Sequence, residues 1–552
     1  MNLSKAKLRI FPVFVIPLLA LFFVNPASAS SFVKPAANPT LHVSTVTPYV
    51  YPLDPSFNPN AAVGGVPFCS SGSLGTILCY PASWLKVAYN FPGFFGNGGL
   101  TGRGSTVVIV DAFGSPTIQS DLNTYDSTFG LPPTTVTILC GPTWTGSPTD
   151  NCPVKTIGDL STAPNAALCG ATGWAEETTL DVTQVHALAP GAKIVLVVAN
   201  DCYDSSLYGA EQAVVMQHKY DGSIMTQSFG EPDDLATCTA LDPTSSYCVS
   251  YDPTLLNLPN SVFQTATKHH WTIIASTGDD GANEDARVLG TLELTPSFPA
   301  TNPLVLAAGG TQGNPYGGQY SGPPGPGGSF SCAAFKFCNT GLLIINGGLN
   351  GCGTAARPGE PSSCVPVLYG GESAWNEATT FLSVDYSTGG GVSSLYSRPS
   401  YQYGTPKSVT TLLGNTVSTL TGRTTPDVSF NSAVYGGVIA YLGFLGRWAV
   451  FGGTSASSPA WAAIIAVLNQ ANGRPVGFIN PAIYQLGARG GFGFFGPFHD
   501  ITSGNNADCS GLCGEDGFVA TNGYDLTTGW GTPNVAAFIL GMQNILQNGN
   551  GQ

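Results

Sequence analysis

The sequence predicts an α/β fold in which helices cover both faces of a mostly parallel central sheet. Two observations predict it. Short runs of β-branched and other apolar residues recur along the chain, and helix-like segments separate several of these runs. Strands that are apolar throughout are buried on both faces, and their alternation with helices is typical of parallel sheets. With 43% hydrophobic residues among 552, the chain can bury one large core despite its 70 Gly and 42 Pro.

The first strand is expected at 106–110, where Thr-Val-Val-Ile-Val is followed by a turn and a helix-like stretch near 118–129. Later strands are expected in four similar runs, at 194–199, 224–228, 272–276 and 304–308. Ligands of open parallel sheets bind outside the carboxyl ends of the strands, so a functional site is expected there.

Residues 1–29 have the pattern of a signal peptide. Three basic residues within the first nine precede an apolar run at 10–24, and the small-residue sequence Ala-Ser-Ala ends at residue 29. This run is short for a membrane span, and no other stretch of about 18 apolar residues follows. We therefore expect a secreted, extracellular protein that is not held in a membrane once the signal is removed.

The main domain is expected at 86–547. Residues 30–85 are rich in Pro, Ser and Thr, and we expect an N-terminal extension in which no full-length propeptide domain is evident. Residues 312–371 interrupt the order of strands and helices with a Gly- and Pro-rich stretch and four cysteines. This pattern predicts a disulfide-tied surface insertion.

Fourteen cysteines suit an exported protein, because disulfides persist in oxidising compartments. Sequence alone does not fix their connectivity, but pairing between close neighbours is the simplest expectation. The expected pairs are Cys69–Cys79, Cys140–Cys152, Cys169–Cys202, Cys238–Cys248, Cys332–Cys338, Cys352–Cys364 and Cys509–Cys513. Zinc binding is the alternative, which is disfavoured because the chain has no C-x2-C and its six histidines do not cluster with cysteines.

The charge of the chain argues against nucleic acid as a partner. Charged residues make up 9% of the sequence and the formal net charge is −14, whereas nucleic-acid binding needs a basic patch. A chain with few charges also has few ion pairs to lose when carboxylates become protonated. The composition therefore suits an acidic medium.

The segment 452–459, Gly-Gly-Thr-Ser-Ala-Ser-Ser-Pro, opens an apolar, helix-like stretch at 460–468. The glycines allow a turn, and proline fits in the first turn of a helix. Ser455 would then lie at a helix N-terminus, where the helix dipole favours the negative charge that a serine nucleophile creates. The alternative is an ordinary capped helix, since Ser and Thr are common at caps.

Glu177 and Asp181 stand four residues apart in the helix-like stretch 174–182, so both carboxyls lie on one face. Neighbouring carboxylates repel each other and can share a proton. Glu177 could then accept the proton of Ser455, while Asp181 takes up part of the resulting change in charge. A solvated helical face is the alternative.

Asp279 follows the predicted strand at 272–276, within the sequence Gly-Asp-Asp-Gly at 278–281. A protonated carboxyl at the carboxyl end of a strand could donate a hydrogen bond to an oxyanion. A plain turn or a calcium loop would explain the same four residues.

The order of Glu177, Asp181, Asp279 and Ser455 resembles the sedolisin family of serine-carboxyl peptidases, which share the subtilisin-like fold. The resemblance extends from about residue 89 to the C-terminus. It includes blocks at 107–111, 187–194, 389–391, 397–401 and 426–429. It implies that Ser455 is the nucleophile, Glu177 the base, Asp181 its partner and Asp279 the oxyanion group.

The same resemblance implies one structural calcium ion near the C-terminus. The stretch 499–526 resembles the family's calcium loop, and oxygen ligands suit this hard cation. The implied ligands are the carboxylates of Asp500 and Asp525 and the carbonyl oxygens of Ile501, Thr521 and Gly523. Two unrelated Asp turns are the alternative.

The resemblance implies an endopeptidase that cleaves polypeptides through an acyl-enzyme. We expect it to be active in acid, because Glu177 has to be ionised while Asp279 stays protonated, and we expect a monomer. A tripeptidyl-peptidase of the same family and a non-catalytic secreted binding protein on the same fold are alternatives. A subtilisin-type Ser-His-Asp triad is disfavoured because its His-Gly-Thr-His segment is absent. His186 could belong to such a triad, but a contact with the helix dipole near a helix end explains this residue equally well.

Two residues near the expected site have open roles. Phe229 stands where the family usually has Trp, which would supply an indole N–H that Phe lacks. Asp111 belongs either to an outer hydrogen-bond network around the carboxyl pair or only to the end of its strand.

Overall fold

The computed structural model describes residues 49–57, 68–71, 75–81, 85–86, 88–92, 99–141, 152–233, 256–284, 294–313, 369, 371–377, 386–417, 420–490, 496–507 and 516–548. All of them lie within one unit that extends from Pro39 to Gln552. The predicted signal peptide, part of the extension 30–85 and most of the predicted insertion 312–371 lie outside the described residues.

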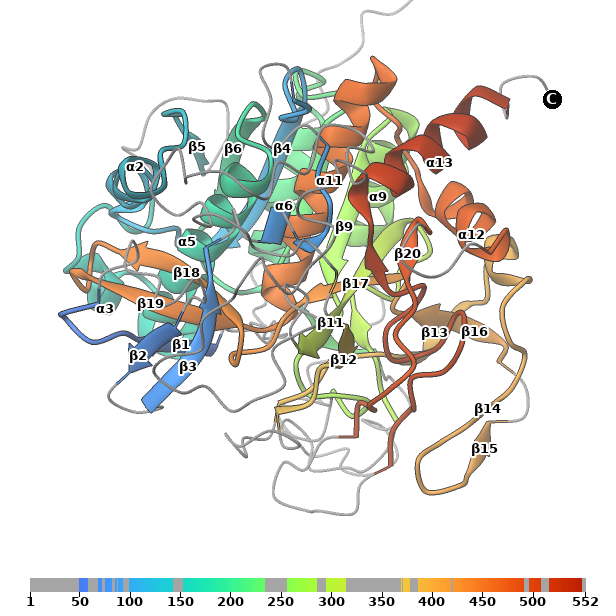
Figure 1. Ribbon diagram of the computed structural model, residues 1–552. Helices are drawn as coiled ribbons and strands as arrows, with labels where there is room; N and C mark the ends of the chain where they lie inside the picture. Colours follow the sequence, from blue (N-terminus) through green and yellow to red (C-terminus); the bar gives the residue numbers. More distant parts are fainter. Residues whose placement is uncertain are drawn as a thin grey trace, which may run out of the picture. The chain divides into compact units, whose positions relative to one another are not determined.

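The central sheet has the strand order β12-β11-β9-β7-β4-β6-β5, and β17 also pairs with β11 (Figure 1). All neighbours are parallel except β12, which is antiparallel to β11. The strands are β4 (Thr106–Ala112), β5 (Thr137–Cys140), β6 (Lys193–Ala199), β7 (Ile224–Gln227), β9 (Thr272–Ser276), β11 (Val305–Gly313), β12 (Glu372–Ala374) and β17 (Val428–Asn431). The predicted parallel sheet and its five expected strands are confirmed.

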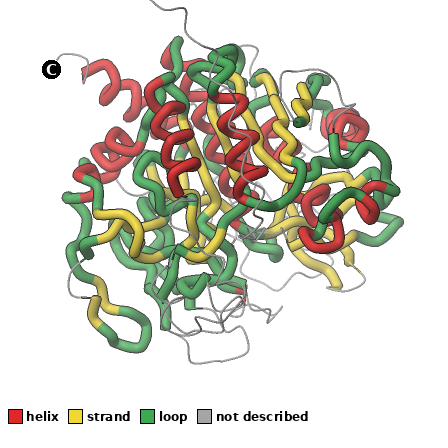
Figure 2. The backbone as a smooth tube through the Cα atoms, turned by 180° about the vertical axis from the view of Figure 1, so that it is seen from behind, coloured by secondary structure: helices red, strands yellow, loops and turns green. Residues whose placement is uncertain are grey.

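Helices pack on this sheet in two groups. The first consists of α2 (Ile118–Phe129), α5 (Ala171–Leu188) and α11 (Ser457–Asn472), and the second of α6 (Asp204–Val215) and α9 (Asn257–Lys268). The opposite views in Figures 1 and 2 both show helices lying over the strands.

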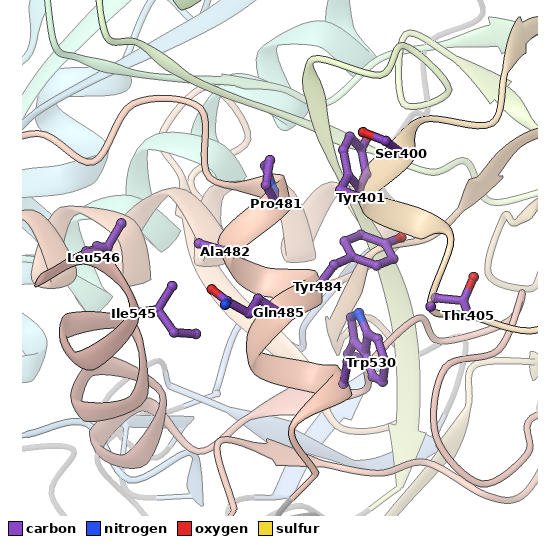
Figure 3. Close-up of a pocket in the computed structure, with 12 residues that line it drawn as sticks. Ser400, Tyr401, Thr405, Pro481, Ala482, Tyr484, Gln485, Trp530, Ile545 and Leu546 are labelled. Atoms are coloured by element: carbon purple, nitrogen blue, oxygen red, sulfur yellow. The ribbon is translucent and has the colours of Figure 1, made fainter. Parts of the chain in front are cut away.

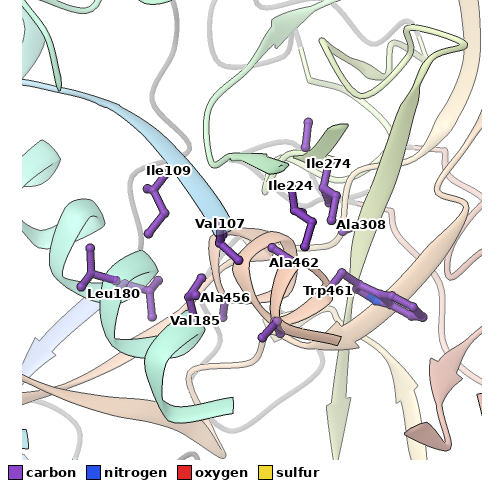
Figure 4. Packing of buried hydrophobic residues seen from close by; sticks show 14 of the residues in the cluster. Val107, Ile109, Leu180, Val185, Ile224, Ile274, Ala308, Ala456, Trp461 and Ala462 are labelled. Atoms are coloured by element: carbon purple, nitrogen blue, oxygen red, sulfur yellow. The ribbon is translucent and has the colours of Figure 1, made fainter. Parts of the chain in front are cut away.

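The side chains of β4 are buried on both faces of the central sheet, so helices have to cover both faces. Its residues from Val107 to Val110 are all fully buried, and successive side chains of a strand point to opposite faces. Figure 4 shows Val107 and Ile109 on the side of α5 and α11, close to Leu180 and Ala462. The prediction of helices on both faces is confirmed.

A second sheet is formed partly by the N-terminal extension, in which the sequence analysis predicted no strands. Its order is β1-β19-β18-β3-β2. The strands are β1 (Tyr49–Pro52), β2 (Phe68–Ser71), β3 (Gly75–Tyr80), β18 (Gly437–Leu442) and β19 (Arg447–Gly452). Because β1 is antiparallel to β19, with Tyr49 opposite Gly452, the extension lies beside the strand that leads to Ser455.

Three of the expected disulfides are present, namely Cys69–Cys79, Cys140–Cys152 and Cys169–Cys202. The other eight cysteines lie outside the described residues. The first disulfide joins β2 to β3, and the third joins the segment before α5 to the segment before α6.

The remaining elements are short except for the two C-terminal helices, which pack against each other. They are α3 (Asp159–Thr162), α4 (Ala166–Cys169), β8 (Glu231–Pro232), β10 (Ser297–Phe298), β13 (Gly391–Ser397), η5 (Ser400–Gln402), β14 (Val409–Thr410), β15 (Thr416–Val417), β16 (Gly422–Thr425), η6 (Thr454–Ala456), α12 (Asn480–Ala488), β20 (Phe498–His499), β21 (Thr532–Pro533) and α13 (Val535–Asn548). No helix in the described part of the chain is long and apolar enough to cross a membrane.

The connections between the central strands diverge beside β4. From β4 the chain runs outward to β5 and returns to β6, whereas from β7 it continues in the other direction to β9. Strands whose connections diverge in this way leave a crevice at their carboxyl ends, where ligands bind in open α/β sheets. Asp111, near the end of β4, and Ser228, directly after β7, lie at that edge.

Candidate active site

Ser455 lies on a tight connection between a strand and a helix. β19 ends at Gly452, Ser455 belongs to the short 3-10 helix η6, and α11 begins at Ser457. Gly453 has a φ of 113°, which an L side chain rarely adopts, and a Cβ there would lie 2.6 Å from Oδ2 of Asp279. The sequence therefore folds as predicted here, with the serine at the amino end of a buried helix.

Glu177 and Asp181 lie on α5, which packs against both η6 and α11. Their side chains are fully buried, so they are not part of a solvated helical face. The Ser455 hydroxyl lies close enough to Glu177 to lower its pKa, although within the described ranges neither Glu177 oxygen accepts a hydrogen bond of regular geometry. Such contacts in enzymes often tighten only when substrate binds.

The two carboxyls strongly affect each other's protonation. Burial raises the pKa of Glu177 well above its ordinary value, and repulsion by Asp181 and Asp111 raises it further. Burial and the charge of Asp111 likewise raise the pKa of Asp181, whereas the hydrogen bond from Ser228 lowers it. Two charges this close and this buried are costly, so the pair holds a shared proton in acid.

Asp111 adjoins this pair, which favours the outer-network interpretation over a purely structural one. It is fully buried near the end of β4. Burial raises the pKa of Asp111 to about 7, and the Thr178 hydroxyl partly opposes this rise. Asp111 thus acts on the pair through its charge.

Asp279 follows β9 and faces the Ser455 connection from the other side. Its Oδ1 accepts hydrogen bonds from the backbone N–H and the hydroxyl of Thr454, both at 2.7 Å. Its carbonyl oxygen accepts from the N–H of Ser387 at 3.0 Å, which holds the loop in place. The charge of Asp279 also contributes to the raised pKa of Glu177, so both carboxyls lie near the same serine.

Ser228 links the two sides of the site, and the sequence analysis did not identify it. Its hydroxyl donates to Asp181 Oδ1 at 3.0 Å and lies 3.4 Å from the carbonyl oxygen of Ser455. Its place at the carboxyl end of a predicted strand was a signal that could have revealed it. The adjacent Phe229 is buried and packs against the rings of Trp174 and Tyr208, at 6.3 and 6.0 Å between centroids.

Histidine has no evident place in this arrangement. His186 is fully buried on α5, where its Nε2 lies 3.0 Å from Asp126 and 3.1 Å from the carbonyl oxygen of Pro132. His499 stacks on the ring of Tyr369. The other histidines in the described ranges lie where β7 and β9 begin, at the opposite end of these strands from Ser228 and Asp279.

The predicted calcium ligands lie in two adjoining segments. The N–H of Gly523 donates to both oxygens of Asp500, at 3.1 and 3.0 Å, and the N–H of Thr521 donates to Asp525 Oδ2 at 2.9 Å. Among the described residues, no backbone N–H donates to the carbonyl oxygens of Ile501, Thr521 or Gly523. Two carboxylates and three such carbonyls are a donor set that fits Ca2+.

Two cavities in the described part of the chain are not lined by Ser455 or by the carboxyls near it. One, of about 670 Å³, lies between η5, α12 and α13 and includes the rings of Tyr401, Tyr484 and Trp530 (Figure 3). The other, of about 590 Å³, begins at Phe113, two residues beyond Asp111, and extends along the start of α2.

The chain is similar to several known peptidases, although no family model matches it. It is 29% identical to kumamolisin of Bacillus sp. (strain MN-32) over 453 residues, which cover 81% of this chain and 61% of kumamolisin. It is 37% identical over 237 residues to tripeptidyl-peptidase SED2 of Arthroderma otae, covering 39% of this chain and 34% of that protein. It is also 30% identical over 294 residues to tripeptidyl-peptidase 1 of Rattus norvegicus, covering 52% and 39%. The chain thus spans about three fifths of kumamolisin and little more than a third of the other two.

Among solved structures, the fold is similar to that of Pseudomonas sedolisin, a serine-carboxyl proteinase complexed with two molecules of pseudo-iodotyrostatin. The TM-score is 0.58 at 22% identity, and the match covers 86% of this chain and all of that one. Fold and relatives agree with the resemblance found in the sequence, and they support the sedolisin family of serine-carboxyl peptidases.

Proposed function

We propose that this protein is a secreted endopeptidase that hydrolyses polypeptides in acid through an acyl-enzyme on Ser455. The observation that carries the proposal is the convergence of Ser455 with the buried carboxyls of Glu177, Asp181 and Asp279, which come from two separate elements. The known peptidases to which the chain is similar support the same reaction class.

In the first step the Ser455 oxygen attacks the carbonyl carbon of the scissile peptide bond. Its proton passes to Glu177, while the proton that the carboxyl pair already shares is held by Asp181. The pair therefore takes up one proton without placing two charges in a buried site. The negative charge appears on the former carbonyl oxygen of the substrate, where a protonated Asp279 donates a hydrogen bond to it.

In the second step the tetrahedral intermediate collapses. The C–N bond breaks, Glu177 returns the proton to the leaving amine, and an ester to Ser455 remains. A water molecule then attacks this ester, with Glu177 again accepting the proton. The bond between the acyl carbon and the Ser455 oxygen breaks, Glu177 returns the proton to this oxygen, and the carboxylic acid product is released. Ser228 positions the site by holding Asp181 and the backbone of Ser455 together.

This mechanism requires an acidic medium. The carboxyl pair has to keep one negative charge, whereas Asp279 has to keep its proton to act as a donor. Both conditions are met in a window governed by carboxyl groups rather than by histidine. We expect a bell-shaped dependence of kcat/KM on pH with its maximum below pH 6.

Replacement of single serines tests the proposal. Ser455→Ala and, as the matched control, Ser457→Ala change two buried serines of the same turn. With a denatured protein as substrate between about pH 2 and 6, Ser455→Ala is expected to lower the cleavage rate by at least about 10³-fold, and Ser457→Ala to leave it near wild type. Cleavage that persists in Ser455→Ala contradicts the mechanism. A wild type that cleaves nothing in this range supports the non-catalytic binding protein instead.

Tripeptidyl-peptidase activity is the second candidate, favoured by the names of two of the similar proteins. Mass spectrometry of the products distinguishes the two activities. Internal fragments of varied length indicate an endopeptidase, whereas tripeptides released successively from the N-terminus indicate a tripeptidyl-peptidase.

The remaining parts of the proposal concern the context of the domain. We place the peptidase domain at 86–547, preceded by a signal peptide at 1–29 and an extension at 30–85, with a surface insertion at 312–371. Three disulfides support an oxidising compartment. One Ca2+ ion held by Asp500 and Asp525 would join two segments near the C-terminus, so that EGTA is expected to lower the Tm of the wild type but not that of Asp500→Asn.

A further inference from the structure

Two histidines and an aspartate converge on the surface where β7 and β9 begin. His218 Nδ1 lies 3.5 Å from Asp221 Oδ1, and His269 Nδ1 lies 3.0 Å from Asp221 Oδ2. The centroids of the two imidazole rings are 4.3 Å apart. Three potential ligand atoms, one from each residue, all lie within 4.8 Å of one another.

The backbone holds these three residues in place. The N–H of Gly222 donates to the carbonyl oxygen of His269 at 2.9 Å, which ties the turn at 218–222 to the end of α9. Both segments then enter neighbouring parallel strands of the central sheet. His218 has a φ of 53°, a conformation that non-glycine residues seldom adopt, so its direction is set by the fold rather than by local preference.

We propose that His218, Asp221 and His269 form a site for a divalent transition-metal ion, with Zn2+ as the best-suited ion. Two imidazole nitrogens and one carboxylate are a common ligand set of zinc with an open coordination position. Calcium and magnesium are disfavoured, because they prefer oxygen ligands alone. Side chains that are partly exposed leave room for water as the fourth ligand.

The site is separate from the proposed peptidase centre. It lies at the amino ends of β7 and β9, whereas Ser228 and Asp279 follow the carboxyl ends of the same strands. A metal ion there would cross-link the turn after α6 to the end of α9. It would therefore stabilise the folded state without taking part in peptide cleavage.

Zn2+ titration of the untagged protein at pH 7.5 tests the site. Ser455→Ala serves as the background to prevent autolysis, and excess Ca2+ occupies oxygen-only sites.

Isothermal titration calorimetry compares three variants. His218→Asn and Asp221→Asn each remove a ligand, whereas His270→Asn is the matched control, because His270 also has a positive φ but is not in the cluster. Asn tolerates this conformation, and a Tm measured without metal verifies that each variant is folded.

We expect one Zn2+ per chain, at least about tenfold weaker binding in His218→Asn and Asp221→Asn, and unchanged binding in His270→Asn. With Cu2+ as a second probe, electron paramagnetic resonance should show two coordinated nitrogens in the control and one in His218→Asn. No binding to the background protein, or equal affinities in all three variants, would overturn the proposal.

Discussion

Glu176 and Glu177 have the same side chain and are neighbours in sequence, but they differ in burial and in the groups around them. Glu177 is fully buried beside Asp181 and Asp111, and the Ser455 hydroxyl lies close to it. Glu176 is only partly buried, and burial alone raises its pKa to about 7. The side-chain type therefore says little about which carboxyl can serve as a base, whereas the neighbours decide it.

The first prediction uses this pair of residues. Glu177→Gln keeps the shape of the side chain but cannot accept the serine proton, so kcat is expected to fall by about 10²- to 10⁴-fold. Glu176→Gln should retain nearly all activity because it does not contact Ser455. Steady-state kinetics on a fluorogenic peptide at the optimum pH measures both. Equal losses in the two variants would argue against Glu177 as the base.

A second prediction concerns Asp279, the proposed oxyanion donor. Asp279→Asn can still accept the hydrogen bonds from Thr454, and its amide N–H donates at every pH. We expect this variant to keep a substantial part of its activity and to remain active further toward neutral pH than the wild type. Asp279→Ala, which has no donor, should lose about 10²- to 10³-fold in kcat. A pH–rate profile of Asp279→Asn with the same upper limb as the wild type would contradict the assigned role.

At the scale of elements, the connection at Ser455 depends on strands that are far apart in sequence. β19 pairs with β18 on one side and with β1, from the extension, on the other. The connection is then closed by Asp279 after β9, which accepts two hydrogen bonds from Thr454. The geometry of the serine thus relies on both sheets.

Gly453 provides the test of this connection. Gly453→Ala places a methyl group against Asp279 at a φ of 113°, so the loop has to move and activity should fall by at least about tenfold. Gly446 is the matched control, because it also has a positive φ, of 66°, but apart from its chain neighbours no described residue has an atom within 4 Å of its Cβ position. Gly446→Ala should cost about 1 kcal/mol of stability with unchanged kcat, measured by urea unfolding and kinetics. Full activity of Gly453→Ala would show that the connection tolerates the shift.

At the scale of the whole molecule, buried carboxyls dominate the electrostatics. Burial raises the pKa of Asp111, Asp204 and Asp233 to about 7, and it raises the pKa of Glu211 and Glu231 well above the ordinary value. The unfolded chain would ionise these groups near pH 4. Between about pH 4 and 7 the folded state therefore binds more protons than the unfolded state.

The sign of the resulting pH dependence follows from this difference. The stabilising contribution of these carboxyls is fully present below about pH 4 and is lost as the pH rises through 7, so the free energy of unfolding should decrease over that range. Urea unfolding at pH 4.5 and at pH 7.5 measures it. Glu211→Gln cannot ionise and should reduce the slope by up to about 1.4 kcal/mol per pH unit. An increase in the free energy of unfolding from pH 4.5 to 7.5 would contradict the stabilising role of these buried carboxyls in acid.

Much of the fold could be predicted because its signals are local. The continuous apolar runs gave β4, β6, β7, β9 and β11 within a few residues, since a strand buried on both faces leaves no polar alternation. The helices α5 and α11 and three disulfides between close neighbours were predicted for the same reason. The strands of the extension were not, because β1 pairs with β19, about 400 residues away, and β3 joins the sheet through β18, about 360 residues away, in addition to its neighbour β2.

The sequence by itself determined which residue types are available at the ends of the central strands, and their order resembles that of the sedolisin family. The tertiary structure alone decided that Asp111 and Ser228 join Glu177 and Asp181, and that His218 meets His269 at the opposite edge of the sheet. The physical reason is that local periodicity reports burial, whereas convergence of distant side chains depends on strand order and crossover connections, which no short segment encodes.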